Sequence, residues 1–233
     1  MPDKEVTLNV ADGTSMLAYT SMPDNIAEKN PAIIVLQEAF GVNSHIKNIT
    51  DRFAAEGYIA IAPELFHRSA PIGFTASYND FGSVSAHLQA LTPEGMQADM
   101  QAAYDWLIEQ KQTDTSKVFS VGYCMGGRAS FLANVTLPLK AAVSYYGGGV
   151  LPLLNKVNEL SGKHLFYWGG LDKHIPKEQV DQVTEALTIA GKPFVNVVFS
   201  NADHGFNCDE RVSYNENASK DAWALTLQFL KDS

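Results

Sequence analysis

The sequence predicts an α/β fold with a mostly parallel central sheet covered by helices on both faces. Short apolar runs of strand length alternate with helix-compatible segments along most of the 233 residues, which is the pattern of successive strand–helix–strand units. Some runs, such as Ala-Ile-Ile-Val-Leu at residues 32–36, are apolar at every position, as in strands buried on both faces. The length suits one α/β domain with a large core, so we expect residues 1–233 to form a single domain.

The sequence places the expected elements in order. Residues 6–10 and 16–20 are expected to form an antiparallel edge pair, because the Ala-Asp-Gly segment between them favours a hairpin turn. The other expected strands are residues 32–36, 58–62, 117–121, 141–146, 165–168 and 194–199. The expected helices are residues 46–56, 93–110, a segment from about 125, 177–190 and 217–230. Residues 69–92 are rich in Pro, Gly, Ser and aromatic side chains, and we expect a long surface excursion there that is able to cover a site.

Charge and composition narrow the class of partner. The net charge is −9 and the sequence pI is about 5.1, which argues against nucleic acid or an anionic membrane surface. The start lacks a secretory signal pattern, and no apolar run approaches the roughly 20 residues that span a bilayer. The two cysteines are too few for a disulfide framework and suit a reducing compartment. We therefore expect a cytoplasmic protein, a monomer or small homo-oligomer, that acts on a small molecule.

Residues 122–126 read Gly-Tyr-Cys-Met-Gly and have the form of a nucleophile elbow with cysteine in place of serine. They follow an expected strand and lead into an expected helix. Glycines suit both ends of such a turn, because the backbone is strained there and the chain approaches itself closely. A lone cysteine is usually a small buried side chain, but this turn would present Cys124 at the top of a sheet.

Two downstream residues complete a set that fits acyl transfer. A cysteine attacks as a thiolate, so it needs a base and a third group that orients the base. Asp172 follows one expected strand and His204 follows the last one. The order nucleophile, acid, histidine is that of the α/β-hydrolase fold, in which His204 would take the thiol proton and Asp172 would orient its ring. Asp203 is adjacent to His204, but neighbouring loop side chains usually diverge, so we favour Asp172.

An oxyanion hole is expected at the same end of the sheet. The backbone N–H of Met125 would supply one donor at the start of a helix, and the loop after residue 36 would supply the other. Glu38 lies in that loop. From its position alone it could equally be an ordinary strand-end carboxylate in a salt bridge.

These motifs together resemble the dienelactone hydrolase, or carboxymethylenebutenolidase, family. The resemblance is carried over nearly the whole chain by residues 37–41, 122–127, 145–147, 172 and 204–206. It implies that Glu38 contacts the nucleophile and joins in its activation when substrate binds, and that the backbone N–H of Ala39 is the second oxyanion donor. We expect no cofactor, and the spacing of Cys, His, Asp and Glu matches no zinc motif.

The substrate is less well defined, because the chain departs from the family pattern. The family holds an anionic lactone through two arginines, one within the segment equivalent to residues 69–92 and one four positions after the catalytic histidine. This chain has no arginine between Arg68 and Arg128, and Cys208 occupies the second position. Arg68 and Arg211 remain as candidates. The candidate substrate contacts are Phe40, Tyr146, Phe206 and Arg211.

The sequence thus predicts a hydrolase that cleaves a carboxylic ester or lactone through an acyl-enzyme on Cys124. A thioesterase or a general carboxylesterase is the alternative within enzymes. A catalytically silent α/β-hydrolase used for binding or redox sensing is the alternative from another class. Cys208 has no catalytic context, so we expect it to pack in the core or line the site, with oxidation to a Cys124 disulfide as a lesser possibility.

Overall fold

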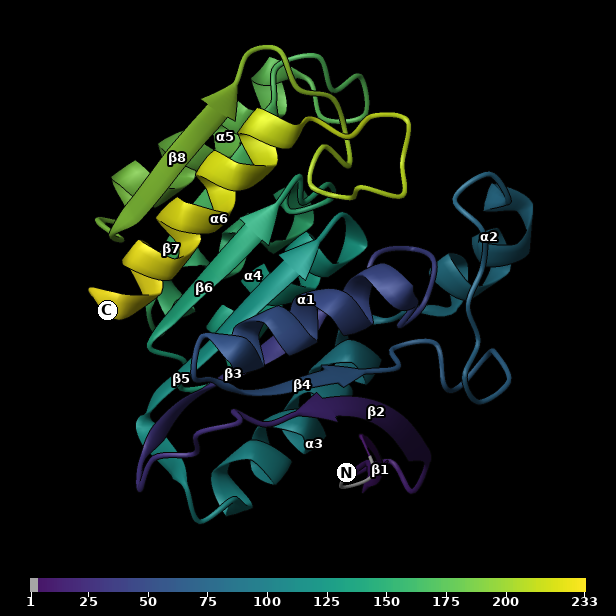
Figure 1. Ribbon diagram of the computed structural model, residues 1–233. Coiled ribbons are helices and arrows are strands. Elements are labelled where there is room, and N and C mark those ends of the chain that lie inside the picture. Colours follow the sequence, from purple (N-terminus) through teal and green to yellow (C-terminus); the bar gives the residue numbers. More distant parts are fainter. Residues whose placement is uncertain (1–3) are drawn as a thin grey trace. The chain divides into compact units, whose positions relative to one another are not determined.

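The computed structural model describes residues 4–233 (Figure 1). Within this range, eight strands form a mostly parallel sheet in the order β1-β2-β4-β3-β5-β6-β7-β8, which confirms the predicted fold class. The chain divides into two compact units, with described residues 4–119 and 120–233, and strand β5 (Thr113–Tyr123) runs from one into the other. A single domain over the whole chain stays a prediction. None of the helices in residues 4–233 combines the length and hydropathy needed to cross a membrane.

The first unit is built on an antiparallel hairpin and a parallel pair. β1 (Glu5–Asn9) pairs antiparallel with β2 (Ser15–Ser21), as expected. In the turn between them, the backbone N–H and hydroxyl of Thr14 donate to the same Asp12 oxygen, at 3.0 and 2.6 Å, so the Asp side chain fixes the turn. β2 also pairs antiparallel with β4 (Ile59–Pro63), and β4 runs parallel to β3 (Asn30–Leu36).

Three helices belong to this unit: α1 (Ser44–Ala55), α2 (Phe81–Ala90) and α3 (Pro93–Glu109). Each begins after an N-cap side chain that accepts a backbone N–H, and these caps are Asn43, Asp80 and Thr92. α1 and α3 pack on opposite faces of the unit's strands (Figure 1). The sequence located α1 and α3 within two residues at each end but did not predict α2.

The excursion at residues 69–92 folds back over the loop that follows β3. The Ala76 N–H donates to the Phe40 carbonyl at 3.2 Å, and a bridge joins Gly41 to Thr75. The rings of Phe40 and Tyr78 lie 4.7 Å apart. A side chain at Gly41 would meet the backbone, since a Cβ there would lie 2.1 Å from the Phe74 carbonyl oxygen. The excursion therefore covers the loop after β3 within the first unit, and its covering of a site stays a prediction.

The second unit carries three parallel strands that follow the end of β5: β6 (Ala141–Tyr145), β7 (Lys163–Gly169) and β8 (Phe194–Phe199). β6 is buried at every position, and β7 is buried at all but its first residue. The apolar runs predicted both strands because a strand covered on two faces needs no polar alternation.

The helices of the second unit cover both faces of its strands. α6 (Glu216–Lys231) lies on one face, and α4 (Met125–Thr136) and α5 (Lys177–Ile189) lie on the other (Figure 1). A 3-10 segment, η1 (Leu151–Glu159), was not predicted. Its bonds are short-range, so its sequence does not carry the 3.6-residue apolar pattern of an α-helix.

A directed chain of buried hydrogen bonds joins α4 to β6 and β7. The hydroxyl of Ser144 donates to the carbonyl of Gly127 at 2.7 Å, so its oxygen accepts from Nε2 of His164 at 2.8 Å. Nδ1 of His164 then accepts from the amide of Asn134 at 3.2 Å. Burial lowers the pKa of His164 to about 3, so the imidazole is neutral and its proton lies on Nε2.

Candidate active site

Cys124 occupies a strained turn between β5 and α4. Strand β5 ends at Tyr123 and α4 begins at Met125, while Cys124 between them has φ 55° and ψ −117°. The Cys124 N–H donates to the Tyr145 carbonyl at 3.0 Å, and the Gly127 N–H donates to the Cys124 carbonyl at 2.9 Å. A positive φ is unfavourable for a residue with a Cβ and persists only where surrounding structure holds it. The elbow predicted from the sequence is therefore present, with the cysteine partly exposed.

Glycines allow the chain to approach itself closely at this turn. A Cβ on Gly122 would lie 1.8 Å from the carbonyl oxygen of Gly126, and one on Gly127 would lie 2.6 Å from the Cα of Gly147. Both separations are far below a van der Waals contact, so no larger residue fits. The first turn of α4 consequently packs against the loop that follows β6.

Asp172 and His204 form the acid–histidine pair that the sequence predicts. Asp172 follows β7 and His204 follows β8, and Oδ2 of Asp172 lies 2.7 Å from Nδ1 of His204. The other carboxylate oxygen of Asp172 accepts the backbone N–H groups of His174 and Ile175, at 2.8 and 3.3 Å. The Asp172 side chain is thus fixed by three hydrogen bonds and holds the imidazole in one orientation.

The electrostatics of this pair favour a charged histidine. Burial works against the imidazolium, but hydrogen bonds to Asp172 and Cys124, and the negative charge on both, raise the pKa of His204 to about 10. Burial likewise works against ionisation of Asp172, yet its hydrogen bonds and the His204 charge leave the pKa of that carboxyl lowered. The two shifts agree in direction, as expected for a carboxylate–imidazolium pair.

Asp203 does not face the ring. Asp203 is exposed, and its carboxylate accepts a hydrogen bond from the backbone N–H of His204 at 2.7 Å. It therefore acts as a turn residue, and Asp172 is the carboxylate that contacts the imidazole, in line with the sequence argument.

Tyr146 and Phe206 pack beneath the histidine. The Tyr146 ring centroid lies 5.1 Å from that of His204 and 5.3 Å from that of Phe206. Tyr146 has φ 38°, another strained non-glycine residue beside the site. Both rings are fully buried, so in this structure they support the imidazole, and their contact with a substrate stays a prediction.

The candidates from the first unit lie in the loop after β3. Glu38, Ala39 and Phe40 are all buried. Gln37 organises this loop: its amide oxygen accepts the Leu65 N–H at 3.0 Å, and its amide nitrogen donates to the Glu38 carbonyl at 3.3 Å. Gln37 is the first residue of the motif at residues 37–41, but the sequence pattern assigns it no role. Only the fold shows which backbone groups its amide reaches. The roles of Glu38, Ala39 and Phe40 stay predictions.

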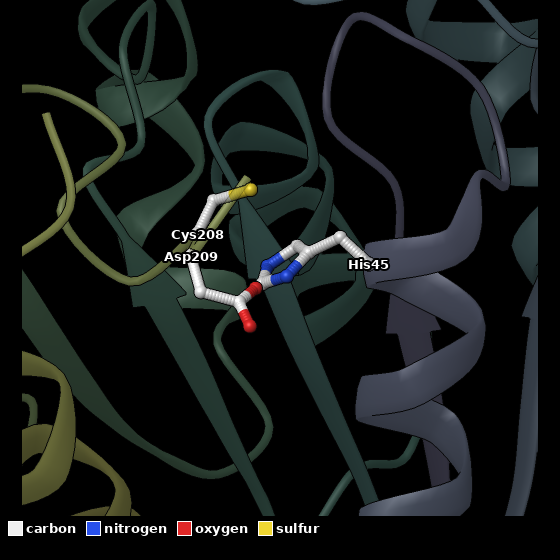
Figure 2. A group of neighbouring side chains, drawn as sticks. All are labelled: His45, Cys208 and Asp209. Atoms are coloured by element: carbon white, nitrogen blue, oxygen red, sulfur yellow. The ribbon is translucent and has the colours of Figure 1, made fainter. Parts of the chain in front are cut away.

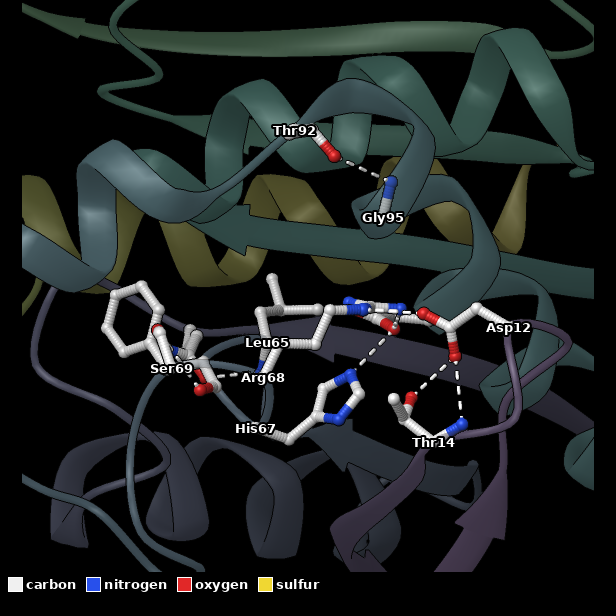
Figure 3. Close-up of polar contacts among 11 residues, drawn as sticks. Asp12, Thr14, Leu65, His67, Arg68, Ser69, Thr92 and Gly95 are labelled. Carbon is white, nitrogen blue, oxygen red and sulfur yellow. Dashed lines mark hydrogen bonds and ion pairs between the residues drawn. The ribbon is translucent and has the colours of Figure 1, made fainter.

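The two candidate arginines lie in different surroundings. Arg68 donates through Nη1 and Nη2 to both oxygens of Asp99, at 2.9 and 2.8 Å, and through Nε to Asp12 at 2.7 Å (Figure 3). Its donors are thus committed to carboxylates of the protein. Arg211 instead lies over Gly205, where a Cβ would be 2.5 Å from its Cζ. Of the two, Arg211 is therefore the arginine beside the His204 loop.

The remaining candidates have structural surroundings. Cys208 and the next residue, Asp209, are drawn in Figure 2. Cys208 is fully buried and its N–H donates to the Gly205 carbonyl at 3.0 Å, while Asp209 is exposed. This burial fits the packing role expected for Cys208. His45 is buried in the first turn of α1 (Figure 2), and His174 is exposed.

A small hollow lies beside the loop that follows β6. Its cavity volume is only about 10 Å³, far below the roughly 300–1,000 Å³ of usual ligand pockets. Its lining consists of Gly147, Gly149, Val150, Leu151, Trp168, Ile175, Gln179 and Val183. It is too small to hold a whole ester substrate.

The fold and the site place this protein in the α/β-hydrolase class. It has a mostly parallel sheet and a cysteine at a strained strand-to-helix turn, and an acid–histidine pair follows that cysteine in the order acid, then histidine. The chain belongs to the dienelactone hydrolase family, whose profile matches residues 16–233. It is accordingly a hydrolase that acts on ester bonds.

Relatives and solved structures agree with this assignment. A protein from Escherichia coli O157:H7, provisionally named a carboxymethylenebutenolidase, is 33% identical over 231 residues, which cover 95% of this chain and 84% of that one. A protein of the same provisional name from Synechocystis sp. is 34% identical over 211 residues, covering 86% and 85%. A crystal structure from Klebsiella pneumoniae, provisionally named a dienelactone hydrolase, superposes with a TM-score of 0.89 at 32% identity and covers 98% of both chains.

Proposed function

We propose that this protein hydrolyses carboxylic esters or lactones through an acyl-enzyme formed on Cys124. The observation that carries the proposal is the hydrogen-bonded pair of Asp172 and His204, which reaches a cysteine held in a strained turn at the start of α4. This is the arrangement that activates a thiol for acyl transfer. Membership of the dienelactone hydrolase family supports the same reaction class.

The proposed cycle has two halves. In the resting enzyme the proton of Cys124 is already on His204, so the pair is a thiolate and an imidazolium. The sulfur attacks the carbonyl carbon to form a tetrahedral intermediate. The carbon–oxygen bond to the leaving alkoxide then breaks, and the proton on His204 passes to that oxygen. Water next gives a proton to His204 and attacks the thioester, the carbon–sulfur bond breaks, and the acid is released.

The high pKa of His204 fits this role. A histidine with a pKa of about 10 is charged at neutral pH, so it already holds the proton that the leaving group needs. Asp172 stabilises that charge through Nδ1. The first N–H of α4, on Met125, has no partner within the helix and is proposed, together with the N–H of Ala39, to bind the oxyanion. Glu38 is proposed to assist activation of the thiol.

The proposed substrate class follows from the proposed reaction and is supported by the relatives. Curated relatives are provisionally named carboxymethylenebutenolidase, which is a lactone hydrolase activity. A lactone and an open ester present the same carbonyl to the sulfur, so we include both. Thioesters remain an alternative substrate class, because a thiolate leaving group needs less protonation than an alkoxide.

The first prediction concerns Cys124. Replacement by alanine removes the atom that would bond to the acyl group, so we expect kcat/KM for every hydrolysed ester, lactone and thioester to fall at least about 10³-fold. The measurement is a substrate panel that includes a dienelactone, with mass spectrometry of rapidly quenched enzyme to find an acyl group on Cys124.

Cys208→Ala is the matched control, since it removes the other thiol of the chain from a fully buried position. We expect it to keep turnover within about threefold of the wild-type value. Equal hydrolysis by wild type and Cys124→Ala would exclude the cysteine mechanism. A wild-type protein that hydrolyses no member of the panel would favour a silent binding protein.

A further inference from the structure

Arg128 is a half-buried cation without an anionic partner. It lies in the first turn of α4, four residues after Cys124. Among residues 4–233 it takes part in no hydrogen bond or ion pair, and its Nε is completely buried. Arg68, by contrast, donates to three carboxylate oxygens. A guanidinium removed from water without a partner is costly, which raises the question of what it normally binds.

The surroundings of Arg128 compensate only part of the cost of burying its charge. Burial lowers the pKa of Arg128, while the negative charge of Cys124 acts in the opposite direction. The start of α4 adds the positive end of the helix dipole. The charge of Cys124 therefore interacts with this guanidinium.

The loop after β6 gives the guanidinium its position. Gly149 has φ +78°, and a Cβ on it would lie 3.2 Å from Cδ and 3.3 Å from Nη1 of Arg128. The side chain of Arg128 therefore packs directly against the backbone of Gly149. Gly147 packs against Gly127 in the same way, at 3.1 Å from a Cβ on Gly147 to the Gly127 Cα. These contacts hold Arg128 at the end of the unit where Cys124 lies.

We propose that Arg128 is a specificity-determining residue that binds an acidic group of the substrate, so that the preferred substrate is an ester or lactone bearing a carboxylate. A guanidinium suits this role because its planar array of N–H donors matches the two oxygens of a carboxylate. The position differs from both places where the family pattern has an arginine, and neither of those is an arginine here. The inference rests on the proposed function for its substrate, but its central test does not need turnover.

That test compares two alkylating reagents of nearly equal size, neutral iodoacetamide and anionic iodoacetate, on the Cys208→Ala protein, in which Cys124 is the only thiol. The carboxylate of iodoacetate lies one carbon from the atom that sulfur attacks, which brings it within the field of Arg128. We expect the ratio of the iodoacetate rate to the iodoacetamide rate to exceed that of free cysteine by about tenfold. Arg128→Met should lower the ratio several-fold and leave only the part that the charged His204 contributes, and Arg128→Lys should lie between wild type and Arg128→Met.

Lys140→Met is the control for net charge. It removes one exposed positive charge just before β6 begins, whereas Arg128 lies against the loop after β6 ends. We expect Lys140→Met to keep the wild-type ratio. Thermal unfolding of each variant checks that it is folded, and Arg128→Lys keeps the test valid if Arg128→Met does not fold.

A second measurement uses hydrolysis of mono(4-nitrophenyl) glutarate and of its methyl ester, which lacks the negative charge. We expect Arg128→Met to lower kcat/KM about 10- to 100-fold more for the acid than for the methyl ester, mainly through KM. If Arg128→Met slows both alkylating reagents equally and leaves their ratio unchanged, the residue acts on the thiol and anion recognition is excluded. A wild type that hydrolyses neither ester but prefers iodoacetate would refute the proposed function and keep this inference.

Discussion

At the scale of single residues, the chemistry of the site depends on how His204 is held. Asp172 binds one ring nitrogen at 2.7 Å, and Asp172 itself is fixed by two backbone N–H groups. These contacts offset the effect of burial and raise the pKa of His204 to about 10. The histidine is therefore an imidazolium at neutral pH because of its neighbours.

The second prediction tests this dependence with Asp172→Asn. The amide keeps the shape but not the charge, so the pKa of His204 should fall from about 10 toward the ordinary value of 6.5. We expect kcat to drop about 10³-fold or more, as when the acid of a related triad is neutralised. The pH dependence of alkylation of Cys124 by iodoacetamide, together with an NMR titration of the imidazole, measures the shift.

Asp203→Asn is the matched control, because Asp203 contacts the backbone N–H of His204 and not its ring. It should keep both the His204 titration and kcat within about threefold of wild type. The assignment of Asp172 as the triad acid would be overturned if Asp203→Asn shifted the titration and Asp172→Asn did not.

At the scale of elements, one buried carboxylate ties together three segments of the first unit. Asp99 of α3 is fully buried and is bound by Arg68 and by Nε2 of His67 at 2.9 Å, both in the turn after β4. Arg68 also reaches Asp12 in the β1–β2 turn (Figure 3). Burial opposes the charge on Arg68, but the two carboxylates leave its pKa raised.

The third prediction is that Arg68→Met destabilises the protein by about 3–5 kcal/mol, because the buried Asp99 carboxylate loses its bidentate partner. Urea unfolding measures the change. Lys177→Met is the control: it removes one member of an exposed pair with Asp181, and we expect a loss below about 0.5 kcal/mol. If both substitutions lowered the free energy of unfolding equally, the contacts between Arg68 and Asp99 would stabilise the protein no more than an exposed ion pair does.

The elements that the sequence missed share a physical reason. α2 buries only Val84, so its sequence shows no apolar stripe, and its start depends on the Asp80 cap. η1 has 3-10 geometry. Strands β6, β7 and β8 were located within two residues at each end because their register is fixed by burial or pairing along their whole length. The start of β5 at Thr113 precedes its expected start because residues 114–117 are polar and mostly exposed, so no apolar run marks this end of the strand.

At the scale of the whole molecule, two histidines with shifted pKa values limit stability at opposite ends of the pH range. His164 has its pKa lowered to about 3 from 6.5, so between these values the unfolded chain binds a proton that the folded chain does not. Stability from this group is complete above 6.5 and is lost as the pH falls toward 3. His204 has its pKa raised to about 10, so its contribution is complete below 6.5 and is lost as the pH rises through 10.

The fourth prediction follows for the acid side. Each group of this kind contributes a slope of up to about 1.4 kcal/mol per pH unit to the free energy of unfolding. We expect His164→Gln to be less stable than wild type at neutral pH. Between pH 6 and pH 4, its free energy of unfolding should change with pH less steeply than that of wild type, by the slope that one bound proton contributes. Urea unfolding across this range measures it.

His174→Gln is the control for this prediction, because it removes an exposed imidazole. It should retain the wild-type slope. A His164→Gln protein with the full wild-type slope would show that another group governs the acid limb.

The sequence by itself determined the alternation of elements, the elbow at Cys124 and the order of Cys124, Asp172 and His204. It could do so because strand burial, glycine-dependent turns and chain order are local properties. It favoured Asp172 over Asp203 as the acid only because neighbouring loop side chains usually diverge. It did not distinguish Arg68 from Arg211 as a ligand for the substrate.

Only the tertiary structure shows which of these side chains meet. The ring of His204 meets Asp172 across 32 residues, Arg68 is bound by Asp99 from another helix, and Arg128 lies unpaired against the loop after β6. Contacts between residues distant in the chain depend on how helices and strands pack, and no local pattern encodes which side chain ends beside which. The sequence therefore predicted the class of reaction, but it could not predict which charged side chains contact one another.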